Sequence, residues 1–209
     1  MSNLKSIYSP LGASNHSKHE RAKQDYYATH PSAIDYLFEV EDFSSDIWEC
    51  ACGGGHLSKR MEQRGKNVWS TDLIDRGFGE TPIDFLAVNR GLFNQKELAF
   101  NGDIITNPPY KLADKFVEKA MKLVDEGKKV AFFLKLTFLE GKSRVKLFEK
   151  HPPKNIWVFS FRTPVARNGE EEMFEKSSAV CYAWFVWQKG FSGKPTIGWI
   201  KERKGRVQE

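Results

Sequence analysis

One eight-residue stretch restricts the possible folds of this chain more than any other feature. Asp103-Ile-Ile-Thr106 has the apolar character of a short buried strand, and Asn107-Pro-Pro-Tyr110 follows it directly. Neither proline has an N–H to donate to a sheet, so the chain must leave the sheet at Asn107. Open α/β sheets bind their ligands at the carboxyl ends of the strands, where Asn107 would lie. The stretch therefore predicts an α/β sheet with a ligand-binding edge.

The four residues at this edge could hold a flat amino group. The side-chain oxygen of Asn107 and the carbonyl of Pro108 can each accept one N–H, and the ring of Tyr110 can stack on the heterocycle that carries the amine. We therefore take Asn107, Pro108, Pro109 and Tyr110 as candidate catalytic residues. The alternative is a tight turn in which Asn and Pro are ordinary residues.

A strand, a glycine-rich turn and a helix precede this stretch. The apolar strand 47–51 runs into Cys52-Gly-Gly-Gly55, and a helix is expected from residue 56 to about 64. This order is typical of the opening of a nucleotide-binding unit, in which Gly53 and Gly55 allow close approach of a cofactor. A second strand, 67–71, ends at Asp72, about 20 residues beyond the glycines, where an acid can accept hydrogen bonds from ribose hydroxyls. The alternative role for Asp72 is a helix or turn cap.

The remaining pattern completes the expected fold. In a third strand at 82–86, Asp84 could accept from an adenine amino group and Phe85 could pack on the ring, or Asp84 could cap a turn. Apolar spacing predicts a helix at 112–125. Further strands are expected at 129–134, 156–161 and 178–187, with helices at 32–37 and 143–150. Together these predict a doubly wound, Rossmann-like α/β domain with a seven-stranded, mostly parallel sheet and a β-rich C-terminal part.

The composition is that of a globular, cytoplasmic protein. Of 209 residues, 40% are hydrophobic and 28% charged, with no run of the roughly 20 apolar residues that a membrane span needs. The length fits one domain, which we expect at 25–200, between a flexible arm at 1–24 and a basic tail at 201–209. The three cysteines, Cys50, Cys52 and Cys181, are sparse and odd in number, so no disulfide framework is expected, and no metal site is expected either.

The charge balance is compatible with a polyanionic partner. The formal net charge is +5, and a basic cluster follows the predicted fifth strand. From it we take Lys135, Lys142, Arg144 and Lys146 as candidates for phosphate contacts. The alternative is a solvated helix face.

These motifs together resemble a known family, the class I S-adenosylmethionine-dependent methyltransferases that methylate the N6 amino group of adenine in DNA and carry Asn-Pro-Pro-Tyr. Asp25-Tyr-Tyr-Ala-Thr-His-Pro31 is similar to the family's N-terminal cofactor segment, with His30 where a second proline is commoner. Glu49-Cys-Ala-Cys-Gly-Gly-Gly-His-Leu57 is similar to its cofactor loop, with Cys50 in place of a frequent proline. The resemblance spans about residues 25–187, and the small, compact chain resembles stand-alone methyltransferases of phages and prophages.

The resemblance implies S-adenosylmethionine as the cofactor, DNA as the partner and direct methyl transfer to a flipped or single-stranded adenine. The implied cofactor contacts are Tyr26, Tyr27, Thr29, Glu49, Ala51, Cys52, Gly53, Gly55, Asp72, Leu73, Asp84, Phe85 and Asn107. Larger members carry a separate target-recognition domain; here we expect sequence recognition to fall to residues 137–177, the N-terminal arm or a partner. Methylation of RNA, methylation of a protein glutamine, and a non-catalytic cofactor- or DNA-binding protein remain alternatives. The oligomeric state stays open.

Overall fold

The computed structural model describes residues 27–89, 100–162, 165–167 and 180–203. The predicted arm at 1–24, Tyr26, and the tail from residue 204 onward lie outside the described residues.

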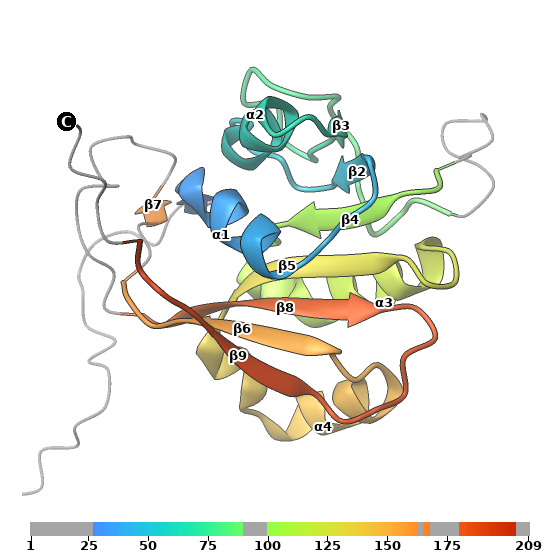
Figure 1. Ribbon diagram of the computed structural model, residues 1–209. Coiled ribbons are helices and arrows are strands. Elements are labelled where there is room, and N and C mark those ends of the chain that lie inside the picture. The colour runs from blue at the N-terminus through green and yellow to red at the C-terminus, as the bar shows by residue number, and fades with distance from the viewer. Residues whose placement is uncertain (1–26, 90–99, 163–164, 168–179, 204–209) are drawn as a thin grey trace, which may run out of the picture.

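The central feature is one twisted sheet (Figure 1). Its strands are β2 Asp46–Glu49, β3 Asn67–Ser70, β4 Asp103–Thr106, β5 Lys129–Lys135, β6 Asn155–Phe159, β8 Tyr182–Gln188 and β9 Thr196–Ile200. In the described part of the chain these seven strands have the order β3-β2-β4-β5-β8-β6-β9. All neighbours run parallel except β8, which is antiparallel to both β5 and β6. The predicted seven-stranded, mostly parallel α/β fold is confirmed.

Helices cover both faces of this sheet (Figure 1). The four α-helices of the described residues are α1 Ser32–Val40, α2 His56–Gln63, α3 Ala113–Leu123 and α4 Lys142–Lys150. The apolar residues of α1 and α2 pack in one core cluster, and those of α3 and α4 in the other. The sheet is therefore doubly wound, as the alternation of strands and helices predicted.

The alternation of side chains along β5 explains how one strand serves both cores. Val130, Phe132 and Leu134 face the core under α3, whereas Ala131 and Phe133 face the core under α1. All five side chains are at most 1% exposed. A strand buried on both faces has a continuous apolar run rather than alternating polarity, which is the pattern seen here.

The order in which strands are added to the sheet changes side between β2 and β4: β3 lies on the far side of β2, and β5 on the far side of β4. Strands β2 and β4 are parallel neighbours, but β2 leads into α2 on one face and β4 leads toward α3 on the other. A crevice forms outside the carboxyl ends of two such strands because their connections diverge. The glycine-rich loop follows β2 and Asn107 follows β4, so both predicted motifs open on this crevice.

A small two-stranded ribbon lies beside the same edge. Residues Tyr27–Thr29 form β1, which pairs antiparallel with β7, Val165–Arg167. Neither strand was predicted from the sequence. Their hydrogen bonds join segments more than 130 residues apart, which no local pattern indicates.

Two details of the predicted sheet are wrong. Residues 82–86 form turns rather than a third strand, because Asp84 closes a turn: Leu86 N–H donates to its side chain and Ala87 N–H to its carbonyl. The seventh strand is instead β9, at the edge of the sheet and parallel to β6. Its glycine, Gly198, and its short length gave no clear strand pattern; the ring of Trp157 occupies the space that a Cβ at Gly198 would need.

Candidate active site

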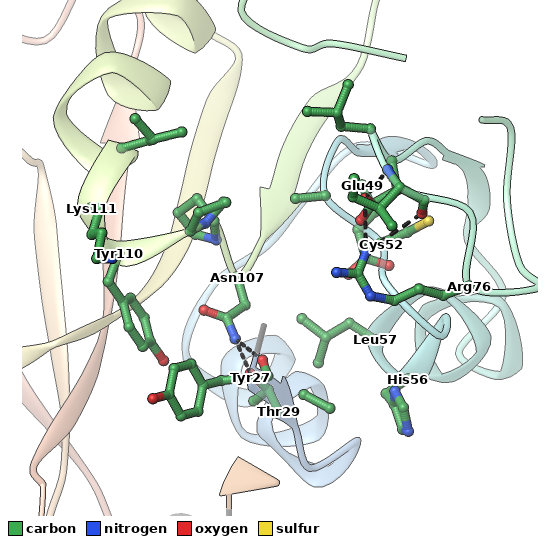
Figure 2. A pocket seen from close by; sticks show the side chains of 18 residues that line it. Tyr27, Thr29, Glu49, Cys52, His56, Leu57, Arg76, Asn107, Tyr110 and Lys111 are labelled. Atoms are coloured by element: carbon green, nitrogen blue, oxygen red, sulfur yellow. Dashed lines mark hydrogen bonds and ion pairs between the residues drawn. The ribbon is translucent and has the colours of Figure 1, made fainter. Parts of the chain in front are cut away.

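A cavity of about 460 Å³ lies at the carboxyl ends of β2 and β4. Figure 2 shows its walls, with Asn107, Tyr110 and Tyr27 on one side and Glu49, Cys52 and Arg76 on the other. The lining residues are Tyr27, Ala28, Thr29, Glu49, Ala51, Cys52, His56, Leu57, Asp72, Leu73, Ile74, Arg76 and residues 107–112. The glycine-loop segment and the Asn-Pro-Pro-Tyr segment thus share one cavity.

Asn107 is held by the N-terminal strand β1. Its Nδ2 donates to the carbonyl of Tyr27 at 2.7 Å and to the hydroxyl of Thr29 at 2.9 Å, both drawn in Figure 2. A carbonyl can only accept, so the contact with Tyr27 fixes which end of the amide is nitrogen. The other end, Oδ1, is buried, and no donor among the described residues reaches it. The fold therefore presents one fixed, unsatisfied acceptor at the cavity wall.

The chain turns away from the sheet after Asn107, as the two prolines require. The short 3₁₀ helix η2, Tyr110–Leu112, follows and is closed by a hydrogen bond from Leu112 N–H to the Pro109 carbonyl at 2.8 Å. The ring of Tyr110 stacks on that of Tyr27, with centroids 5.8 Å apart and planes inclined by 27°. An aromatic surface therefore lies next to the Asn107 amide.

The glycine-rich loop and the loop after β3 are tied together by Asp72. Its Oδ2 accepts the Gly53 N–H at 2.8 Å, and its Oδ1 accepts the Ile74 N–H at 2.8 Å and pairs with Arg76 at 3.3 Å. Gly55, with φ of +79°, is the N-cap of α2, and the ring of Phe78 occupies the space that a Cβ there would need. These contacts hold a carboxylate at the cavity, between the two loops.

A second carboxyl group, Glu49, lies at the end of β2 and is 2% exposed. The hydroxyl of Ser58 donates to its Oε2, and Ser58 is in turn 2.6 Å from the hydroxyl of Ser70. Burial, reinforced by the nearby charge of Asp72, raises the pKa of Glu49 to about 8 against the opposing hydrogen bond from Ser58. Glu49 is thus largely protonated at neutral pH.

The cysteines at the cavity are unsuited to nucleophilic chemistry. Burial, with a further effect of Glu49, raises the pKa of the Cys52 thiol to about 12 and that of Cys50 well above its usual value. The thiolate is the reactive form of cysteine, so both remain inert near neutral pH.

The structure brings most of the predicted site residues together, but not all. Gly53 and Gly55 support the cavity without lining it. Asp84 is exposed and caps a turn, while Phe85 is buried in the core against Phe116, 4.9 Å between ring centroids. Neither residue lines the cavity, so the predicted contact with an adenine ring has no support in this geometry.

The predicted phosphate-binding residues separate into two groups. Lys135, the last residue of β5, does not line the cavity, but its ammonium lies 4.7 Å from the centre of the ring of Tyr110, which does. Lys142 and Lys146 are exposed on α4. The guanidinium of Arg144 donates to the carbonyls of Thr137 and Glu140, at 3.0 and 2.9 Å, and so closes the turn η3, Leu136–Leu139. Arg144 thus has a structural role in this fold.

Several lining residues were not predicted. They are Ala28, His56, Leu57, Ile74, Arg76, Lys111 and Leu112. Each lies within four residues of a predicted one, in β1, at the start of α2, after Asp72 or after Tyr110. A sequence argument based on whole loops rather than on single motif positions could have found them.

Comparison with known proteins identifies the fold. The chain matches no protein-family model and no curated protein sequence. Among solved structures, it is similar to a Listeria monocytogenes protein assigned to the class I S-adenosylmethionine-dependent methyltransferases: TM-score 0.56, 15% identity, 89% of this chain and 68% of that one covered. It is also similar to the modification subunit of a protein from Vibrio vulnificus assigned as a type I restriction enzyme: TM-score 0.57, 14% identity, 87% of this chain and 48% of that one.

These similarities define a class of fold. The chain has the Rossmann-like fold of the class I S-adenosylmethionine-dependent methyltransferases. It spans about two thirds of the Listeria protein and about half of the Vibrio subunit. Within the described residues, none of the helices has the length and apolar character needed to cross a bilayer.

Proposed function

We propose that this protein is an S-adenosylmethionine-dependent methyltransferase that acts on the exocyclic amino group of adenine in DNA. The observation that carries the proposal is the buried Oδ1 of Asn107, which no described donor reaches. A buried acceptor without a donor costs about 1–3 kcal/mol, so native structures rarely keep one without a reason. An amino group of a substrate would supply the missing N–H.

The cavity fits a cofactor of this kind. Its volume of about 460 Å³ lies within the range of about 300–1,000 Å³ of ligand pockets. The carboxylate of Asp72 would accept the ribose hydroxyls, as acids at this position of such folds do. Leu73, which lines the cavity and is 53% exposed, would pack on the adenine ring of the cofactor. When bound, S-adenosylmethionine supplies a methyl group activated on a sulfonium.

The protein's part is to orient the amine and localise its lone pair. The amino nitrogen of adenine is a poor nucleophile because its lone pair is delocalised into the ring. Asn107 Oδ1 and the Pro108 carbonyl would each accept one N–H and so favour tetrahedral geometry at nitrogen. Acceptors held in place beforehand stabilise the positive charge that develops there in the transition state. The bonds from Asn107 to β1 supply that preorganisation.

Three observations favour DNA as the substrate. The segment 25–31 resembles that of adenine-N6 methyltransferases, and the basic side chain of Lys135 lies beside Tyr110. The similarity to a restriction-enzyme modification subunit points in the same direction. Since a duplex hides the adenine amino group, the base would be flipped out or supplied single-stranded.

One assay tests the substrate. The protein is incubated with labelled S-adenosylmethionine and unmethylated DNA, RNA or protein, and the products are digested to nucleosides or amino acids. We expect N6-methyladenine from DNA. Label in guanine from RNA or in protein glutamine would overturn the assignment to DNA.

Two variants test the site. Asn107→Ala should lower kcat by about 100-fold or more, the usual loss when one preorganised group is removed. Asn67→Ala, at an exposed asparagine on β3 outside the cavity, is the matched control. Equal activity in the two variants would refute the role of Asn107.

A further inference from the structure

Strand β9 ends the main sheet on the side opposite β3 (Figure 1). Among the described strands it pairs only with β6, so its other long side has no strand beside it. Its residues Ile197 and Trp199 are 50% and 63% exposed, and Trp199 is the most exposed large apolar side chain of the described residues. An open sheet edge that carries apolar side chains is a template for pairing with another chain.

The opposite edge strand, β3, lacks these properties. Its carboxyl end is closed by Glu80, whose N–H donates to the Ser70 carbonyl at 2.9 Å. Val68 and Trp69 are both partly buried, and the ring of Trp69 stacks on that of Trp48 with centroids 4.4 Å apart. The fold thus covers one edge of the sheet and leaves the edge at β9 open.

The hydrogen bonds between β9 and β6 show which backbone groups face outward. The N–H of Thr196 donates to the Lys154 carbonyl at 3.0 Å, so Thr196 directs its backbone groups toward β6. Because alternate residues of a strand direct their N–H and C=O groups to opposite sides, Ile197 and Trp199 direct theirs to the open edge. Their side chains lie on one face of the sheet, with Gly198 between them.

We propose that β9 pairs antiparallel with β9 of a second copy of this chain, about a two-fold axis at Gly198. In this register Ile197 lies opposite Trp199 of the partner subunit, and the same contact recurs on the other side of the axis. Each of these pairs exchanges two hydrogen bonds, and Gly198 meets its own copy in the closer, non-hydrogen-bonded pair without a side chain. The interface is self-complementary, as two-fold symmetry requires.

The two neighbouring registers fit less well. An axis at Ile197 would place Pro195, which has no N–H, opposite Trp199 of the partner subunit and lose a hydrogen bond on each side of the axis. An axis at Trp199 would place the apolar Ile197 opposite the charged Lys201 of the partner subunit. Only the register about Gly198 places both apolar side chains opposite apolar ones and gives every pair its N–H groups.

The charges at the two ends of β9 favour the same register. Lys194 and Glu202 each lie four positions from Gly198, so by register each lies opposite the other across the axis. Both are exposed, and neither forms an ion pair with another described residue. The dimer therefore has two pairs of opposite charge, one on each side of the axis.

The interface is small and remote from the cavity. Two tryptophans, each burying about 150–250 Å², with two isoleucines and four main-chain bonds give an area at the low end of specific interfaces, below about 1,200 Å². We therefore expect a reversible dimer with a Kd on the order of micromolar. Since β5, β8 and β6 lie between β4 and β9, the two cavities stay open in the dimer.

The first experiment measures association by sedimentation velocity from about 1 to 100 μM, the range suited to an interface of this size. The mass should rise from 24.0 kDa toward twice that value. Trp199→Lys removes both buried rings and should raise the dimer Kd at least about tenfold. Leu139→Lys, at a 41% exposed apolar residue in η3, is the matched control and should leave the Kd unchanged.

Two outcomes of this experiment would contradict the proposal. A wild type that stays monomeric at the highest concentration would overturn it and leave the edge to a different partner. A dimer of Trp199→Lys as tight as that of the wild type would show that the interface lies elsewhere.

The second experiment tests the register through charge reversal. Lys194→Glu alone, or Glu202→Lys alone, places like charges opposite each other on both sides of the axis and should raise the dimer Kd about 2- to 30-fold, the effect of two exposed ion pairs. In an equimolar mixture of the two variants, one pair is reversed at both ends and the other is unchanged, so heterodimers should form with nearly the wild-type Kd. Both variants must be folded to associate, so this result separates lost pairing from lost folding. A mixture that associates no more tightly than either variant alone would refute the pairing about Gly198.

Discussion

Glu49 makes a sharp prediction about stability and pH. It is 2% exposed at the end of β2, and no lysine or arginine of the described residues forms an ion pair with it. Burial, with the charges of Asp72 and Glu62, raises its pKa from 4.5 to about 8. Between these values the folded protein keeps the proton that the unfolded chain has lost, so folding takes up one proton. The contribution of Glu49 is fully present below pH 4.5 and is lost as pH rises toward 8.

The size of the effect follows from that interval. One pKa unit corresponds to about 1.4 kcal/mol, so the loss amounts to about 1.4 kcal/mol per pH unit and on the order of 5 kcal/mol over the whole interval. Glu49→Gln keeps the shape and a hydrogen-bond acceptor for Ser58 but cannot ionise in either state. The free energy of unfolding of the variant, minus that of the wild type, should therefore increase with pH at about that slope.

Urea denaturation at half-unit steps from pH 5 to 8, without cofactor, measures this difference. Glu149→Gln, at an exposed acid on α4, controls for the loss of a negative charge. If the curves for Glu49→Gln and the wild type run parallel across the interval, Glu49 has the same protonation in the folded and unfolded states. The reasoning from burial would then be wrong.

Three further predictions concern the cavity walls. Gly79→Ala should lower the free energy of unfolding in urea by about 1 kcal/mol or more beyond the loss in Gly77→Ala. The two glycines have similar φ angles, +75° at Gly79 and +77° at Gly77, but only at Gly79 would an added Cβ meet a backbone oxygen, that of Ser70 at 2.8 Å. Equal losses in the two variants would show that the loop moves to make room. Thr29→Val, which removes one acceptor of the Asn107 amide, should lower kcat up to about tenfold in the methylation assay, and an unchanged kcat would show that the Tyr27 carbonyl suffices. Asp72→Ala should raise the Kd for S-adenosylmethionine about 10- to 100-fold by calorimetry; an unchanged Kd would remove Asp72 from the cofactor site.

The sequence predicted those parts of the candidate site for which the local residue pattern and the strand topology agree. A strand that ends in two prolines must leave the sheet, and a strand that ends in glycines opens a cofactor loop, so Asn107 and the residues after Glu49 were expected at one edge. The order of the strands then made them neighbours. The prediction of a third strand at 82–86 was wrong because Asp84 closes a turn there. A short apolar segment with one aspartate has the same sequence pattern in a strand and in a turn.

Other features depend on contacts that no local pattern contains. The bond from Asn107 to Thr29 spans 78 positions, and the cluster of Tyr27 with Lys135 joins two separate strands. The raised pKa of Glu49 depends on how deeply the end of β2 is buried. The role of Arg144 depends on η3, the turn that follows β5 in the chain. The motifs, the family resemblance and the charge pattern gave these residues their expected roles, and the packing adds contacts that these patterns do not contain.

The two halves of the cavity have different structural origins. The half around Asp72 is built by loops that directly follow β2 and β3, two neighbouring strands of the main sheet. The half around Asn107 is complete only when β1 is in place, because the amide takes its orientation from Tyr27 and Thr29, and β1 pairs with β7 rather than with the main sheet. Changes in β1 should therefore affect the acceptor step while the cofactor half keeps its shape. Binding of S-adenosylmethionine and the methyl-transfer step can therefore be measured separately, by calorimetry and by the methylation assay.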